Sequence, residues 1–230
     1  MMLPQAGNDD IAVVIPAYNA GARLEPVLLK TLAVIPKRNV IVVDDGSTDQ
    51  THDVAVVTGV EVLTHPSNRG KGVALKTGFA HAMAQPQIQA VITMDADGQH
   101  DPKHVPEFIR VLRASPVDLL IGCRTLRWPV MPFFRVLSNR MTSALVSRRL
   151  GQRIPDSQSG YRLHSRRLLE QIKLDTGGYE TESELLLKAV RAHMQLGFIP
   201  IATIYSGETS HIRGWRDTSR FIKMWLTQTH

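Results

Sequence analysis

Acidic and amide side chains alternate along the short segment Met94–Pro102, and their spacing is typical of a site for a hard divalent cation. Asp95, Asp97 and Gln99 stand at alternate positions in this segment. The apolar run Ala90–Thr93 precedes them and predicts a buried strand that delivers these side chains to the ligand crevice of an open α/β sheet. Carboxylate and amide oxygens suit Mg²⁺ or Mn²⁺, and either ion would keep coordination places for water and phosphate oxygens. The alternative is that one aspartate caps the following helix and the others are solvated.

Two more polar loops follow predicted strands. In the loop Ile15–Gly21, backbone groups and the ring of Tyr18 would contact a nucleotide; alternatively, Asn19 caps an ordinary strand-to-helix turn. A second loop begins with Asp44 and Asp45, and a carboxylate there can accept hydrogen bonds from a base or a ribose hydroxyl. The residues that follow them would cap the next helix, and both roles are compatible.

A glycine-rich segment, Asn68–Gly78, resembles a phosphate-binding loop at the start of a helix. Gly70 and Gly72 allow close backbone approach, while Arg69 and Lys71 supply positive charge. The segment matches neither the Walker A pattern nor a dinucleotide fingerprint in its usual place. The alternative is a helix start with solvated cations.

Alternating strands and helices in the first 125 residues must position these loops. The predicted strands are Ile11–Pro16, Val40–Val43, Val60–Leu63, Ala90–Met94 and Val117–Gly122. The predicted helices are Ala22–Val34, Ser47–Val57, Lys71–Ala84 and Pro102–Ala114. This order predicts an α/β fold with a mostly parallel, Rossmann-like central sheet flanked by helices.

The second half follows without a visible linker, so we expect its elements to complete the same sheet. It is predicted to contain a helix at Met131–Leu150, a polar turn entering a short strand at Asp156–Arg162, a helix at Glu180–Gln195, a strand at Phe198–Tyr205 and a basic, aromatic tail at Trp215–Leu226. The whole chain is therefore expected to form a single domain, 1–230.

Positive charge is concentrated in the middle of the chain. The span Arg124–Arg167 contains ten arginines and one acid, a net charge of +9, whereas the whole chain carries +6. This asymmetry predicts an anionic partner, although no nucleic-acid motif is present. The single cysteine, Cys123, excludes an intrachain disulfide and fits a reducing compartment. We recognise neither a signal peptide nor a bilayer-spanning window, so we expect a cytoplasmic protein.

Five motifs together resemble those of family-two glycosyltransferases with the GT-A fold. In order, they are IPAYN, DDGSTD, NRGKGVALKTG, MDADGQHDP and DSQSGYR, within roughly residues 10–205. The branch they resemble most is that of dolichol- and polyprenyl-phosphate mannosyl- and glucosyltransferases. The resemblance implies that about 10–125 binds a nucleotide-sugar and that about 126–230 forms the acceptor half. The chain lacks the QxxRW motif of processive synthases.

The resemblance also implies roles for individual residues. The expected nucleotide-binding residues are Pro16, Ala17, Tyr18, Asn19, Asp44, Asp45, Lys71, Asp95 and Ala96. Asp95, Asp97 and Gln99 would hold Mg²⁺ or Mn²⁺ on the donor diphosphate. The expected catalytic residues are Asp97, Arg124, Asp156 and Arg162, and the expected acceptor residues are Ser159, Arg127 and Arg135. Glu180 and Glu182 resemble an acidic segment that follows these motifs.

The implied reaction is an inverting transfer of one hexose from a GDP-mannose or UDP-glucose type donor to a polyprenyl phosphate or a related lipid. A metal and arginines would stabilise charge on the leaving diphosphate. A phosphate acceptor needs no general base because its oxygens are anionic near neutral pH, whereas a hydroxyl of a glycolipid or polysaccharide would make Asp156 the best base candidate. A nucleotidyltransferase and a non-catalytic nucleotide-binding module are two further functions that these residues allow. The sequence does not indicate an oligomeric state.

Cationic, amphipathic segments indicate where the chain would bind a lipid surface. Phe134, Leu137, Met141 and Leu145 share one side of a predicted helix that also carries arginines. Such a helix can lie on the cytoplasmic face of an anionic membrane, as can the basic tail; alternatively, their apolar faces pack on the sheet.

Overall fold

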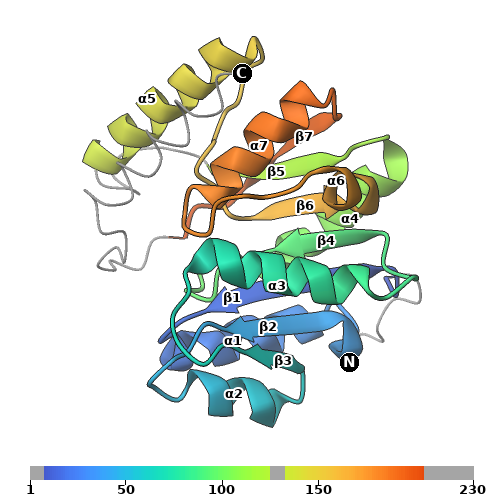
Figure 1. Cartoon of the computed structure of the whole chain (residues 1–230), viewed down its shortest axis with the longest axis vertical. Coiled ribbons are helices and arrows are strands. Elements are labelled where there is room, and N and C mark those ends of the chain that lie inside the picture. The colour runs from blue at the N-terminus through green and yellow to red at the C-terminus, as the bar shows by residue number, and fades with distance from the viewer. Residues whose placement is uncertain (1–7, 125–132, 205–230) are drawn as a thin grey trace.

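The computed structural model describes residues 8–124 and 133–204 of the chain, which form a single seven-stranded sheet with helices on both faces (Figure 1). The strands are β1 Ile11–Ala17, β2 Val40–Asp44, β3 Glu61–Thr64, β4 Ala90–Thr93, β5 Leu119–Arg124, β6 Arg162–Ser165 and β7 Leu196–Ile201. The α-helices are α1 Gly21–Leu32, α2 Thr51–Thr58, α3 Lys71–Met83, α4 Val105–Ala114, α5 Phe133–Leu150, α6 Arg166–Gln171 and α7 Thr181–Arg191. Two short 3₁₀ helices lie at Lys37–Asn39 and Pro102–His104.

The sheet has the order β3-β2-β1-β4-β6-β5-β7. Every pair of neighbours is parallel except the two pairs that β6 makes with β4 and β5. β1, β2 and β4 are continuous apolar runs because they are covered on both faces, as parallel strands require. The predicted α/β sheet is confirmed, and the second half of the chain joins it through β6 and β7.

Two apolar clusters fill the space between the sheet and its helices. Side chains of α1, α2 and α4 pack on one face of the sheet, around Leu28 and Phe108. Side chains of α3, α6 and α7 pack on the other face, around Phe79 and Leu186. In Figure 1, α5 lies beside this second group, at the end of the molecule. None of the helices in the described residues combines the length and apolarity needed to cross a bilayer.

Several predicted boundaries differ from the structure for identifiable reasons. The helix predicted from Ser47 begins at Thr51, because Asp49 accepts hydrogen bonds from the amide of Gly21 and from Thr51 instead of starting a helical turn. The strand predicted to begin at Phe198 begins two residues earlier, at Leu196, because β7 pairs residue by residue with β5 from Leu196 to Ile201. The periodicity did not reveal that β6 runs antiparallel, since this depends on the pairing of β6 with its neighbours.

Candidate functional site

The functional side chains gather at the edge of the sheet where β1, β2, β4 and β5 end and β6 begins. Ala17 pairs with Asp44 at the ends of β1 and β2, and Thr93 at the end of β4 pairs with Arg162 at the start of β6. This edge is the usual place for ligands in open α/β sheets. The loops predicted from the sequence to carry chemistry therefore meet.

Asp95 and Asp97 lie in the loop that follows β4. The backbone amide of Asp95 donates to Nδ1 of His100 (2.9 Å), and the amide of Gln99 donates to Oδ1 of Asp97 (2.9 Å). The ring of His100 is buried and stacks on Tyr161, with 5.1 Å between the ring centroids. His100 thus helps to fix the conformation of this acidic loop. Burial lowers the pKa of its imidazole, which favours the neutral form that accepts the hydrogen bond.

The two carboxylates have opposite electrostatic environments. Burial alone would raise the pKa of Asp95, but Lys71, with Nζ 2.6 Å from Oδ1, and His100 lower it to about 2. The pKa of Asp97 is raised, first by burial and then by the negative charge of Asp95. The loop therefore presents two like charges that repel each other.

These residues fit a divalent cation that completes its coordination elsewhere. Asp95 and Asp97 offer hard carboxylate oxygens whose repulsion a dication would relieve. Among the described residues, no three His, Cys, Asp or Glu side chains converge closely enough to hold a metal alone. The remaining ligands would have to be water or the oxygens of a bound phosphate.

The loop after β2 organises the glycine-rich segment. Asp45 accepts hydrogen bonds from the amides of Arg69 (3.0 Å) and Gly70 (2.8 Å) and lies 2.6 Å from Nδ1 of His65. Asp44 accepts one from the amide of Ser47 (3.0 Å). Both carboxylates, which the sequence places at the nucleotide, are buried and bonded to the protein.

The loop after β1 presents a half-exposed aromatic ring. Tyr18 is 42% exposed, whereas Ala17 is buried. Asn19 does not cap α1; its side chain accepts a hydrogen bond from the amide of Thr48 (2.9 Å), and its backbone has a positive φ of 50°. The loops after β1 and β2 are thus bonded together and leave the Tyr18 ring partly open to a ligand.

Asp156 is fully buried and bonded on both oxygens. Arg124 donates to it through Nε (2.8 Å) and Nη2 (3.0 Å), and Asn139 of α5 donates to Oδ1 (2.9 Å). Burial alone would raise the pKa of this carboxyl, but the hydrogen bonds and charge of Arg124 lower it. Asn139 was not among the residues predicted from the sequence, although Asn139, Ser143 and Ser147 recur every fourth residue and form a polar stripe.

Arg162 lies beneath the site and is 1% exposed. Its guanidinium donates to three backbone carbonyls, those of Ser157 (2.9 Å), Ser159 (2.7 Å) and Glu182 (2.6 Å). It thereby joins the loop that carries Asp156 to the first turn of α7. Ser159 is also fully buried.

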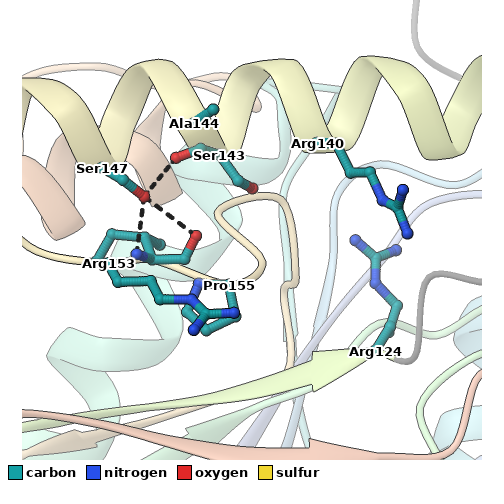
Figure 2. A pocket seen from close by; sticks show the side chains of 8 residues that line it. Arg124, Arg140, Ser143, Ala144, Ser147, Arg153 and Pro155 are labelled. Carbon is teal, nitrogen blue, oxygen red and sulfur yellow. Dashed lines mark hydrogen bonds between the residues drawn. The ribbon is translucent and has the colours of Figure 1, made fainter.

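A pocket of about 500 Å³ opens beside Arg124, between α5 and the segment that follows it. Figure 2 shows the guanidinium groups of Arg124 and Arg140 facing each other, with Arg153 on the opposite wall near Ser147. Three guanidinium groups around one pocket favour an anionic ligand. Arg140 and Arg153 contributed to the basic span in the sequence, but the pattern did not show that they share a pocket with Arg124.

Some expected residues cannot be placed at the site. Arg127 and the tail Trp215–Leu226 lie outside the described residues. Arg135 belongs to α5, but the position of its side chain is not described. Their assignments to the acceptor and to a membrane stay predictions.

The sequence matches a family model described as Glycosyl transferase family 2 over residues 12–173. The chain belongs to this family. The resemblance carried by the five motifs is thereby confirmed, and the matched region contains Asp95, Asp97, Arg124, Asp156 and Arg162.

Two other proteins have sequences similar to that of this chain. An uncharacterised protein of Methanocaldococcus jannaschii is 37% identical over 165 residues, which cover 69% of this chain and 65% of that protein. An undecaprenyl-phosphate mannosyltransferase of Micrococcus luteus is 30% identical, over 67% of this chain and 65% of that protein. The matches thus span slightly less than two thirds of the length of these two relatives.

Solved structures show the same fold. The glucosyl-3-phosphoglycerate synthase of Mycobacterium tuberculosis, in complex with Mn²⁺, UDP and glucosyl-3-phosphoglycerate, superposes with a TM-score of 0.74 and 22% identity. The match covers 94% of this chain and 78% of the synthase. The same synthase with Mg²⁺ and UDP gives a TM-score of 0.76 at 23% identity. The predicted GT-A type of α/β fold is confirmed by this likeness.

Proposed function

We propose that this chain is an inverting, metal-dependent glycosyltransferase that moves a hexose from a nucleotide-sugar to a polyprenyl phosphate or a related lipid phosphate. The observation that carries the proposal is the pocket lined by Arg124, Arg140 and Arg153, because the charge of Arg124 also helps to lower the pKa of Asp95 in the acidic loop. The pocket would bind an anionic acceptor, and the acidic loop would bind a metal-bound donor.

On the donor side, Asp95 and Asp97 would hold Mg²⁺ or Mn²⁺, with Gln99 as a further candidate ligand. The bound cation would supply Lewis-acid stabilisation of the leaving diphosphate. Tyr18, with its half-exposed ring, would contact the nucleotide from the loop after β1. The solved structures of the synthase, which contain UDP with Mn²⁺ or Mg²⁺, support this assignment.

On the acceptor side, the environment of Asp156 favours a phosphate over a hydroxyl. A general base needs a free lone pair within reach of the substrate proton and a pKa near the working pH. Arg124 and Asn139 occupy both oxygens of Asp156, and Arg124 lowers its pKa. A phosphate monoester needs no such base because its oxygens are anionic near neutral pH. Asp156 is therefore assigned to orienting Arg124 at the rim of the pocket.

The exposed face of α5 would bring the pocket to a membrane. Leu137, Met141 and Leu145 are 43%, 58% and 60% exposed and recur every fourth residue, so they form one apolar stripe. Their exposure supports a membrane contact over the alternative that the apolar face of the helix packs on the sheet. Arg140, which lines the pocket, is exposed on the same helix. An apolar stripe with cations is typical of helices that lie in the headgroup region of anionic membranes.

A donor screen tests the proposed function. The purified chain would be incubated with Mn²⁺, a short polyprenyl phosphate and GDP-mannose, UDP-glucose or UDP-N-acetylglucosamine in turn, with the matching polyprenol as the control acceptor. We expect release of a nucleoside diphosphate and a glycosylated lipid phosphate, and no transfer to the alcohol. Transfer to the alcohol would favour a hydroxyl acceptor. Pyrophosphate release would indicate a nucleotidyltransferase, and donor binding without turnover a non-catalytic module.

A further inference from the structure

Lys71 occupies a position between two carboxylates at the centre of the site. Its Nζ lies 2.6 Å from Oδ1 of Asp95 and 3.2 Å from Oε1 of Glu182. The same three groups converge beneath Gly160, where an added Cβ would lie within 3.1 Å of an oxygen of each carboxylate and of Nζ. An ammonium group therefore neutralises Asp95 in the protein without ligands.

The packing of α3 fixes Lys71 in this position. Gly70, just before the helix, has a φ of +98°, and Gly72 lies so close to α7 that an added Cβ would overlap Oγ1 of Thr181. The amide of Val73 also donates to the carbonyl of Gly177 (3.1 Å). Because the backbone on both sides of Lys71 is held against the start of α7, its side chain points between Asp95 and Glu182.

We propose that Lys71 is a built-in counter-cation that suppresses metal binding to the free protein, so that the divalent ion and the nucleoside diphosphate bind cooperatively. The inference rests on the proposed function, because it takes Asp95 as a ligand of the metal. A dication that approaches Asp95 is repelled by the ammonium group and must share a carboxylate whose charge is already compensated. A diphosphate brings enough negative charge to accommodate both cations.

The proposed coupling is thermodynamic and therefore reciprocal. If the nucleotide raises the affinity for the metal by some factor, the metal raises the affinity for the nucleotide by the same factor. Removal of the charge of Lys71 should reduce this factor mainly by tightening metal binding to the nucleotide-free protein. A residue that only supported the fold would not change the coupling in this direction.

The test measures Mn²⁺ binding without any turnover. Electron paramagnetic resonance of free Mn²⁺ would give the dissociation constant of the full-length chain alone and with saturating UDP or GDP. We expect weak binding by the wild type alone and much tighter binding with one of the nucleotides. In Lys71→Met, removal of the repulsion between the two cations should tighten binding to the nucleotide-free protein roughly 10-fold or more, and the effect of the nucleotide should shrink.

Three further variants make the result decisive. Lys71→Gln removes the charge but can still donate a hydrogen bond to Asp95, so it should behave like Lys71→Met even if that variant fails to fold. Lys71→Arg keeps the charge and should retain the wild-type dependence on nucleotide. Lys76→Met is the matched control, because Lys76 lies on the same helix but donates to the carbonyl of Thr176 (2.7 Å).

Two results would overturn the inference. One is unchanged or weaker Mn²⁺ binding by folded Lys71→Met and Lys71→Gln without nucleotide, with folding checked by circular dichroism. The other is wild-type binding of Mn²⁺ that neither nucleotide tightens. Both measurements of Mn²⁺ binding are independent of the donor screen. A chain that does not transfer a sugar can therefore be distinguished from one in which Lys71 does not suppress metal binding.

Discussion

Arg124 and Asp156 form a two-pronged ion pair, with Nε 2.8 Å from Oδ2 and Nη2 3.0 Å from Oδ1. The pair joins the end of β5 to the loop before β6, and Arg124 also lines the pocket that it shares with Arg140 and Arg153. Because the carboxylate is fully buried, its charge depends on these partners. The pair therefore connects the stability of this edge of the sheet with the shape of the proposed acceptor site.

Asp156→Asn should destabilise the fold. The variant leaves the guanidinium of Arg124 without its counter-charge, and breaking a buried pair in this way costs about 3–5 kcal/mol. Urea unfolding at neutral pH would measure the loss. Arg124→Lys keeps the charge but loses the second parallel bond, so it should cost less. Equal stability of Asp156→Asn and the wild type would contradict the importance of the pair.

Asp97→Ala should abolish metal-dependent glycosyl transfer without unfolding the protein. We expect turnover to fall roughly 100-fold or more, since a developing charge would lose its cation. The raised pKa of Asp97 means that its charged form is disfavoured in the folded state, so the free energy of unfolding at neutral pH should stay equal or rise. Asp53→Ala, an exposed acid on α2, is the control. Undiminished turnover under full chelation would refute the metal assignment.

Arg140→Gln should weaken the lipid-phosphate acceptor selectively. Loss of one charged hydrogen-bond donor from the pocket should raise the KM for a short polyprenyl phosphate roughly 10-fold and leave the KM for the donor unchanged. Steady-state kinetics with each substrate varied in turn would show the difference. Arg110→Gln is the control, because Arg110 is exposed on α4 and pairs with Glu107. An equal rise in both KM values would argue against an acceptor pocket.

Replacement of Leu137, Met141 and Leu145 by serine should release the protein from anionic vesicles. Each exposed apolar side chain is worth on the order of 1 kcal/mol when it enters a headgroup region, so partitioning should fall at least about 10-fold. Stability should change little because these side chains are exposed. Serine at the exposed Leu29 and Val57 provides the control. Unchanged vesicle sedimentation of the triple variant would exclude this face of α5 as the membrane contact.

Glu184→Gln should remove a defined part of the pH dependence of stability. Burial alone would raise the pKa of Glu184, but hydrogen bonds from Lys188, Thr176 and the amide of Asp175 lower it to about 2. A depressed pKa contributes stability above the ordinary value of about 4.5, and this contribution is lost as the pH falls towards about 2. Glu184→Gln should lose up to about 3 kcal/mol at pH 7 and converge with the wild type at low pH.

Unfolding of both proteins in urea between pH 2.5 and pH 7 would test this convergence. Glu170→Gln is a suitable control, because Glu170 is exposed and its pair with Arg166 lies at the surface. A constant difference between Glu184→Gln and the wild type across this range would show that Glu184 does not act through its charge.

Much of the site was predictable because its signals are local. Continuous apolar runs identified β1, β2, β4 and β5, and the polar residues that end them had to lie at one edge of a parallel sheet. Asp95 and Asp97 were found in this way, whereas Arg124 was assigned from the resemblance to the family. The same reasoning placed Asp44 or Asp45 at a ligand. In the structure, the carboxylate of Asp45 accepts hydrogen bonds from the amides of Arg69 and Gly70, and its role at a ligand stays a prediction.

The chain by itself determined the α/β class, the order of its loops and the segments that carry chemistry, since apolar periodicity and turn residues act over a few positions. Only the tertiary structure decided that β6 inserts antiparallel between β4 and β5, that Lys71 meets both Asp95 and Glu182, and that the apolar stripe of α5 faces outward. Lys71 and Glu182 are more than a hundred positions apart, and α5 has both an apolar and a polar stripe. Such contacts depend on packing between elements that are distant in the sequence, so local sequence patterns do not predict them.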